Sequence, residues 1–492
     1  MQQALSLVRN CKPGLSHGVI LVLLLLASAP GPAAAQTCPN NPPTPTISSQ
    51  LPSDVCIPPP PGFTGNPIAF FDDFSWRSFI AMVWPVQQGQ RGVPDPGQSI
   101  GPVSGPLVFE TLKADWEVFQ KPPADGTSPP PAPSAWNSYE GQNPCSQYGA
   151  TNVGFGDMVL ASFSKYGNLG EAGFGNLVGP LPTQYGTYTR YFTAFNQTEF
   201  QQILGQNLYL RSNLPASGVT FQPGALDLKA AWIDMTNVPN PERYYTRTAW
   251  VMNPFTTPDP TCTEITVGLV GLHIVQKTPS RPQWIWSTFE QIDNVPGGAS
   301  QGPFTYNNGT AQPPPITANT NNPNPWPPPA SPTMVNVIRL TPINQSTAST
   351  NKQYQSALQA KGGPWQYYQL VMTQWPQQLT PSQPIPPTQS GNPPFTFPGS
   401  GATSAFANVA LETFDQGSIF TGCMACHTNA QKTTDFLWSL EVNAWPSKIT
   451  APSAPPLFAR APSPEADAAL TEPTLTAPLA ALKELMESAA TP

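Results

Sequence analysis

The run Thr263-Glu-Ile-Thr-Val-Gly-Leu-Val-Gly-Leu-His-Ile-Val-Gln276 is the most apolar strand candidate in the chain. Its β-branched residues and its lack of proline predict a long strand buried in a sheet. Similar runs separated by turn residues predict further strands at Leu226–Ile233, Tyr244–Met252, Gln283–Ile292, Val335–Leu340 and Trp365–Met372. We therefore expect a β-rich domain at residues 63–400 whose sheet is mainly antiparallel.

Helical patterns lie on both sides of these strands. Phe71–Trp84 places its apolar residues on one face and ends before Pro85, as a helix would. The same criteria predict helices at Leu107–Phe119, Thr198–Leu204, Thr403–Phe414 and Pro478–Ser488. The β domain is thus expected to carry helices at its N-terminal end.

The composition indicates a globular chain with long loops. Apolar residues make up 39% of it, including 13 Trp and 24 Phe, which is enough for a sizeable core. Only 10% of residues are charged, and 66 prolines and 37 glycines indicate loops draped over that core. The net charge of −7 with no basic patch argues against nucleic acid and anionic membranes as partners.

The N-terminus has the organisation of a signal peptide. Arg9 and Lys12 precede the apolar run Gly18–Ala27, and small residues follow at Pro30–Ala35. We predict that residues 1–35 are a signal peptide and that the protein is periplasmic or secreted. No later stretch approaches the roughly 20 apolar residues of a membrane span, so none is expected.

Cys423-Met-Ala-Cys-His427 is a Cys-x-x-Cys-His sequence, the pattern of a c-type haem attachment site. Two thiols at this spacing can form thioethers with the two vinyl groups of one haem, and the adjacent histidine can bind the iron as proximal ligand. A zinc site would need four Cys or His ligands, and the sequence has no second pair. We predict one covalent haem c per chain, bound by Cys423, Cys426 and His427.

The remaining cysteines fit an oxidising compartment. Without Cys11 of the leader and the two haem cysteines, four remain. They predict two disulfides, for which three connectivities can be drawn. We favour Cys38–Cys56, which closes a short loop in the Pro-rich arm at residues 36–62, together with Cys145–Cys262.

The haem motif lies in a segment, residues 401–447, of about 50 residues, which is near the lower limit for an independent core. We expect this segment to dock its haem on the β domain, and residues 448–492 to form an Ala/Pro-rich tail with a short helix. The predicted fold class is α+β. It comprises a mainly antiparallel β domain with N-terminal helices and a short helical C-terminal haem-bearing segment docked on it.

The sixth iron ligand is the main question that the motif leaves open. After the leader the chain has only two histidines, His273 and His427, so an imidazole ligand from this chain must be His273. Met486 is the methionine alternative, and a vacant or water-bound site is another. Four aromatic residues are candidates for the haem edge or for ordinary packing: Trp284, Trp286, Trp438 and Trp445.

Several blocks resemble a family of secreted bacterial proteins described as cytochrome c family proteins. These blocks are Trp76–Pro85, Lys229–Trp232, Val267–Asn294 and Asn408–Glu412, the last leading into the haem motif. The resemblance spans most of the chain after the leader and includes His273. It implies export and a single c-type haem, and it implies no particular reaction.

Three classes of function remain. The leading hypothesis is an exported monohaem cytochrome that exchanges electrons with an unidentified redox partner, in an oligomeric state that stays open. The alternative is a haem enzyme, of peroxidase or oxygenase type, with an open or exchangeable sixth site. It would need a distal acid or base, for which His273 is a candidate, assisted by Arg281 or Glu290. A binding or sensor module is the third class.

Overall fold

The computed structural model describes residues 44–56, 67–102, 105–123, 125, 127–140, 143–149, 153–161, 181–253, 261–298, 300–309, 330–375, 407–413, 416, 423, 427 and 430–446. Its strands are β1 Lys113–Ala114, β2 Val159–Leu160, β3 Arg190–Phe195, β4 Leu226–Asp234, β5 Thr246–Asn253, β6 Thr261–Thr278, β7 Arg281–Gln291 and β8 Tyr368–Gln374. Its helices are α1 Ile68–Met82, α2 Asp115–Val118, α3 Gln197–Gly205, α5 Gln345–Gln359, α7 Gln431–Thr434 and α8 Trp438–Asn443.

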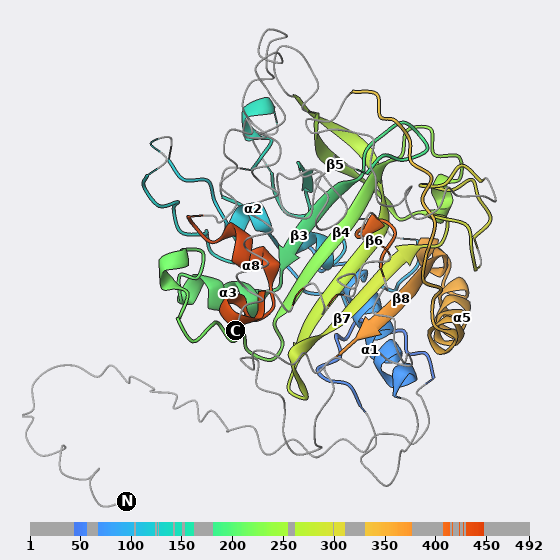
Figure 1. The fold of residues 1–492 in the computed structure, drawn as a ribbon, viewed down its shortest axis with the longest axis horizontal. Coiled ribbons are helices and arrows are strands. Elements are labelled where there is room, and N and C mark those ends of the chain that lie inside the picture. Colours follow the sequence, from blue (N-terminus) through green and yellow to red (C-terminus); the bar gives the residue numbers. More distant parts are fainter. Residues whose placement is uncertain are drawn as a thin grey trace, which may run out of the picture. The chain divides into compact units, whose positions relative to one another are not determined.

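The long strand β6 organises one eight-stranded sheet (Figure 1). Its first half pairs with β5, its second half pairs with β7, and β4 lies along its other edge. β3 and β1 extend the sheet beyond β4, and β8 extends it beyond β7. β6 therefore contacts three strands, and backbone hydrogen bonds satisfy both of its edges.

One face of the sheet is covered by α1 and α5. Ser75 of α1 shares hydrogen bonds with Ser287 of β7, at 2.8 Å, and with Thr373 of β8, at 2.7 Å. Trp76 of α1 stacks on Tyr354 of α5 with ring centroids 5.1 Å apart, and both rings are buried. The apolar face of α1 thus supplies much of the main core.

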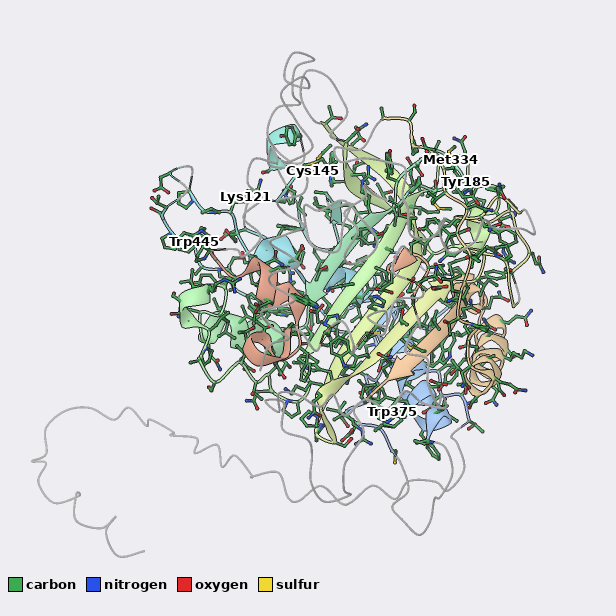
Figure 2. All side chains as sticks on the ribbon, viewed as in Figure 1. Lys121, Cys145, Tyr185, Met334, Trp375 and Trp445 are labelled. Carbon is green, nitrogen blue, oxygen red and sulfur yellow. A yellow bond between two sulfur atoms is a disulfide. The ribbon has the colours of Figure 1, made fainter. Side chains whose placement is uncertain are left out.

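α1 also reaches the end of β8. Phe71 stacks on Trp375, which is labelled in Figure 2, with ring centroids 3.6 Å apart. A buried aromatic pair of this kind stabilises the fold beyond its area burial, by about 0.5–1.5 kcal/mol. It fixes the N-terminal end of α1 against the sheet.

The opposite face of the sheet is covered by the C-terminal segment. Asn408 donates hydrogen bonds to Thr288 and to the Phe289 carbonyl of β7. Gly271 of β6 allows the close approach, because a Cβ at this position would lie 3.2–3.3 Å from atoms of Leu411, Ala410 and Asn408. Two short helices of the same segment, α7 and α8, follow it on this face, where Ser439 donates to Asp227 of β4 at 2.6 Å.

The predicted fold class, α+β, is wrong. The described structure is mostly β, and among its helices only α1, α3 and α5 exceed eight residues. The sheet is mixed rather than purely antiparallel, because β2 pairs with β5 in parallel. β2 has only two residues, which is too short to give a readable pattern. The described part of residues 401–447 contains only two short helices, α7 and α8, of four and six residues, so a helical haem-bearing segment of the predicted kind is not observed.

Several element predictions are confirmed and others are wrong. α1, α3, β4, β5, β6, β7 and β8 occur where the sequence patterns predict a helix or a strand. Leu107–Phe119 is instead a short 3₁₀ turn followed by β1 and α2. Val335–Leu340 contains no strand, and the described residues 407–413 form turns rather than a helix. Residues 1–35 and the predicted helix at 478–488 lie outside the described residues.

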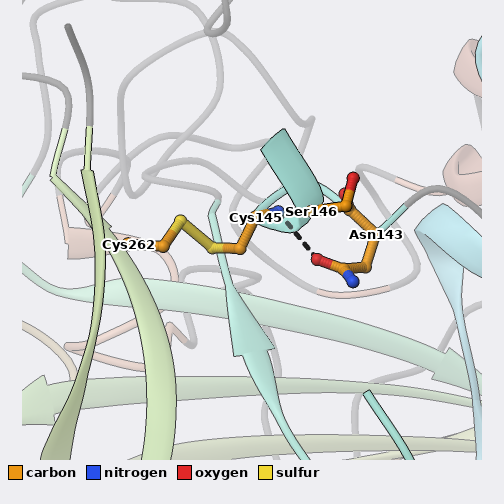
Figure 3. The surroundings of a disulfide bond; sticks show 4 residues. All are labelled: Asn143, Cys145, Ser146 and Cys262. Atoms are coloured by element: carbon orange, nitrogen blue, oxygen red, sulfur yellow. Dashed lines mark hydrogen bonds between the residues drawn. A yellow bond between two sulfur atoms is a disulfide. The ribbon is translucent and has the colours of Figure 1, made fainter. Parts of the chain in front are cut away.

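The predicted Cys145–Cys262 disulfide is confirmed (Figure 3). It joins the residue before a short 3₁₀ turn to the beginning of β6, across a sequence separation of 117 residues. Asn143 accepts a hydrogen bond from the Cys145 amide at 2.8 Å and shapes the chain before the bridge. Cys38 lies outside the described residues, so the Cys38–Cys56 pairing stays a prediction.

Candidate haem-attachment site

Two residues of the motif, Cys423 and His427, are described, and both have helical backbone and half-buried side chains. His427 lies against the sheet face that the C-terminal segment covers, since its ring contacts Trp286 of β7. Cys423 packs against the main hydrophobic core. Met424, Ala425 and Cys426 lie outside the described residues.

The His427 ring is oriented by two contacts. Its Nδ1 lies 2.6 Å from the Phe436 carbonyl oxygen, and its ring centroid lies 4.3 Å from that of Trp286 on β7. A carbonyl oxygen can only accept, so Nδ1 carries the proton and the lone pair of a neutral imidazole is on Nε2. Metal-bound histidines usually donate their second ring N–H in this way, which fixes the ring and raises its basicity.

Phe436 belongs to a strained turn between α7 and α8. Asp435 and Phe436 have φ values of 53° and 72°, in the left-handed region that non-glycine residues seldom adopt. Such residues cost about 1–3 kcal/mol each and persist only where surrounding contacts hold them. Here the carbonyl of Asp435 accepts from Trp284 Nε1 at 2.9 Å, and its carboxylate accepts from the Phe221 amide at 2.8 Å.

The Asp435 carboxylate also forms a buried ion pair with Lys277 of β6. Burial raises the pKa of Asp435 to about 6, against the opposing effect of Lys277. Burial likewise lowers the pKa of Lys277, against the opposing effect of Asp435. Desolvation therefore outweighs attraction on both sides, so the pair holds a geometry at some cost in stability.

His273 and His427 lie on the same face of the sheet. Trp286, which contacts His427, pairs with Val275 of β6, and cross-strand partners point to the same face. His273 is two residues from Val275, so it shares this face about 7 Å further along the strand. The two histidines remaining after the predicted leader are therefore neighbours on one surface, although 154 residues separate them in sequence.

His273 is held by a carboxylate. Its Nε2 lies 2.8 Å from Oε1 of Glu412, and the other oxygen of Glu412 accepts from the Asn408 amide. An ionised carboxylate can only accept, so Nε2 is the protonated nitrogen of the neutral ring. The buried Nδ1 has no hydrogen-bond partner within the described part of the chain. A carboxylate on one nitrogen and a lone pair on the other is the arrangement of a metal-ligating histidine.

The other candidates are placed less favourably. Arg281 lies over the ring of Phe71, on the face that α1 covers. Glu290 is committed to Arg339 and to the amide of Val409. Trp284 and Trp438 are buried. Trp445 lies just after α8 and forms an isolated β-bridge with Leu210. Trp286 contacts a motif residue directly, through the ring of His427. Met486 lies outside these residues.

Buried acids accompany the C-terminal segment on this face. Asp227 of β4 accepts from Ser439, and burial raises its pKa. Glu199 of α3 is fully buried, and both of its carboxylate oxygens are without hydrogen-bond partners in the described structure. Burial raises its pKa well above the usual value, with Asp227 and Asp435 adding to the effect.

Sequence reasoning missed the groups that support the two histidines. Glu412, Phe436, Asp435 and Lys277 have no distinctive spacing from the histidines in the sequence. Glu412 belongs to one of the blocks that carry the family resemblance, and this was the only available signal. The contacts of Phe436, Asp435 and Lys277 depend on the folded conformation of the chain.

In comparisons with known proteins, no family model, no curated protein and no solved structure matches the chain. Among the described residues, no helix has the length and apolar character to cross a membrane. The same residues contain no group of three or more His, Cys, Asp or Glu side chains placed to hold a metal ion. That finding does not bear on a haem, whose iron takes only axial ligands from the protein.

Proposed function

We propose that this protein is an exported monohaem c-type cytochrome that exchanges electrons with a redox partner. The observation that carries the proposal is the orientation of His427 within a Cys-x-x-Cys-His sequence. Its Nδ1 donates to a backbone carbonyl, which leaves the lone pair on Nε2. This is the state that a proximal haem ligand requires.

The residues present fit a covalent haem. Cys423 and Cys426 would hold it by thioethers, and His427 would bind the iron from one side. Bound haem c supplies a one-electron iron couple whose potential depends on axial ligands, hydrogen bonding and burial. Trp286 and the Phe436 carbonyl restrict the His427 ring.

His273 is the proposed distal ligand. It lies on the same sheet face as His427, and Glu412 fixes the tautomer in which Nδ1 can bind a metal. Two imidazole ligands would leave no open position on the iron, which suits electron transfer rather than reaction with a substrate.

The first experiment tests attachment. The Cys423→Ser/Cys426→Ser variant should lose the haem that otherwise remains bound after denaturation. A matched Cys145→Ser/Cys262→Ser variant should retain it, because that pair forms the disulfide. Covalent haem in the first variant would overturn the proposal.

The second experiment tests ligation. Visible spectra of the oxidised and reduced protein should be low-spin and unaffected by carbon monoxide. His273→Ala should become high-spin in part and bind carbon monoxide. If this variant retains the native spectrum, His273 is not a ligand.

A haem enzyme is the second candidate function, and the His273–Glu412 pair favours it. A histidine hydrogen-bonded to a carboxylate can serve as a general acid or base beside a vacant iron site. Carbon monoxide binding by the unmodified protein would favour this candidate over the carrier.

A further inference from the structure

Three residues with positive φ meet at one place. Five described non-glycine residues have positive φ: two asparagines, and Trp284 at 72°, Asp435 at 53° and Phe436 at 72°. Asparagine and aspartate tolerate this conformation, whereas aromatic residues such as Trp284 and Phe436 seldom adopt it. The indole of Trp284 donates to the carbonyl of Asp435, so strained strand and strained turn touch directly.

An irregularity in the sheet creates this contact. The pairing of β6 with β7 shifts register between Gln276 and Thr278, at Lys277, and the facing residues of β7 include Trp284. Bulges of this kind re-aim side chains and are frequent beside functional sites. Lys277 reaches the Asp435 carboxylate, and its Nζ also lies 5.4 Å from the centre of the Trp284 ring.

We infer that Lys277, Trp284 and Asp435 are positioning residues that set the orientation of the proximal ligand His427 through the Phe436 carbonyl. This inference rests on the proposed function. The bulge binds both the side chain and the carbonyl of Asp435, and these contacts hold the turn in its left-handed conformation. This conformation points the Phe436 carbonyl at Nδ1 of His427. Lys277 and Trp284 contact the turn at Asp435, and the turn contacts His427 through the Phe436 carbonyl.

The inference predicts a change in electronic properties, not only in stability. A strong hydrogen bond from Nδ1 gives the imidazole more negative character and makes it a better donor to iron. Loss of the aligned carbonyl should weaken this donation. The haem reduction potential should then rise, and the g values of the oxidised haem should change because the ring can rotate.

The test uses the full-length protein with haem attached. Asp435→Ala removes the carboxylate contacts and disfavours the left-handed turn, so the reduction potential should shift upward. The Asp435→Asn variant keeps a short oxygen acceptor for Lys277 and the Phe221 amide, and a residue that tolerates positive φ. It should retain most of the native potential and g values. Ser439→Ala, which breaks another buried contact of the same segment, should leave both unchanged.

The outcomes separate this inference from the proposed function. Absence of covalent haem from the unmodified protein would overturn both. Covalent haem with a native potential and native g values in Asp435→Ala would overturn only this inference. An equal shift in Ser439→Ala would also overturn it, since any loosening of the segment would then suffice. If Asp435→Ala does not fold, Trp284→Phe removes the indole hydrogen bond while keeping an aromatic ring, and an unchanged potential there counts against the inference.

Discussion

At the scale of single residues, two histidines with opposite hydrogen-bonded nitrogens define the candidate site. His427 donates from Nδ1 to a carbonyl, and His273 donates from Nε2 to a carboxylate. The acceptors differ in strength, because a charged acceptor polarises the ring more than a neutral one. Glu412 should therefore control how firmly His273 binds a metal.

Glu412→Leu should weaken distal ligation. Loss of a carboxylate that orients a metal-ligating histidine typically costs 10–100-fold in affinity. We expect carbon monoxide to bind this variant about 10–100-fold more tightly than the unmodified protein, because His273 competes less well for the iron. Glu412→Gln keeps a hydrogen-bond acceptor and serves as the matched control, with a smaller effect. Carbon monoxide titrations that are identical in all three proteins would contradict this role for Glu412.

The sequence alone identifies His273 and His427 because histidine is scarce, with only three in the chain. It cannot identify Glu412, since nothing local links an acidic residue to a histidine 139 positions earlier. The role of the Phe436 carbonyl is still harder to predict from the sequence. Backbone atoms carry no residue-specific signal, and their use depends on the conformation of the turn.

At the scale of elements, helix α1 buries two carboxyl groups whose charged forms are destabilised by loss of water. Asp72 and Asp73 are buried in its first turns. Asp72 accepts from Thr373 of β8 at 2.9 Å, and Asp73 accepts from the Tyr354 hydroxyl at 2.5 Å. Burial raises the pKa of Asp72 to about 7 and that of Asp73 to about 6, and the hydrogen bonds oppose this only in part.

These values make stability fall as pH rises. The folded protein binds a proton at Asp72 up to about pH 7, whereas the unfolded chain loses it near the ordinary carboxyl pKa of 3.8. Between these two values the folded state holds the extra proton, so the free energy of unfolding decreases with rising pH. A shift of this size corresponds to at most about 4 kcal/mol.

Asp72→Asn should remove most of this dependence. The amide oxygen can still accept from Thr373, and no charge is buried at position 72 above pH 7. We expect the variant to be more stable than the native protein at pH 8, by up to about 4 kcal/mol, and to differ little at pH 4. Urea unfolding at the two pH values measures this, with Asp125→Asn in an exposed loop as control. The same pH slope in Asp72→Asn and the native protein would refute the assignment.

Strand patterns were readable because apolar and β-branched residues must fill a sheet, and β6 is the clearest example. Helix patterns were less reliable. The spacing of Phe109, Leu112, Trp116 and Phe119 suggests a helix. The intervening Glu110 and Lys113 are buried in polar contacts with other parts of the chain, and these contacts require turns. α5 was missed because its sequence is largely polar and only a few residues, such as Tyr354 and Leu358, face the core.

At the scale of the whole molecule, the sheet is covered on one face by early and middle segments and on the other by the C-terminal segment. The expectation that the C-terminal segment would contact the β domain came from its shortage of core residues. The choice of face could not be predicted, because β6 directs apolar residues to both faces, such as Val275 to one and Ile274 to the other. Gly271 decides it, since its lack of a side chain admits the turn at Asn408–Leu411.

The Cys145–Cys262 bridge acts on the whole chain, since it closes a loop of 117 residues. In the chain-entropy description a loop of this length stabilises the folded state by about 5 kcal/mol, and measured values are typically 2–4 kcal/mol. The Cys145→Ala/Cys262→Ala variant should therefore lose about 2–5 kcal/mol in denaturant unfolding. The disulfide packs with Val159 and Met252, in a cluster separate from the core around Cys423, so the haem spectrum should not change. The native protein under reducing conditions should match the variant. A variant that keeps its stability but loses its haem would contradict this assignment, because it would place the bridge at the haem site rather than in the fold.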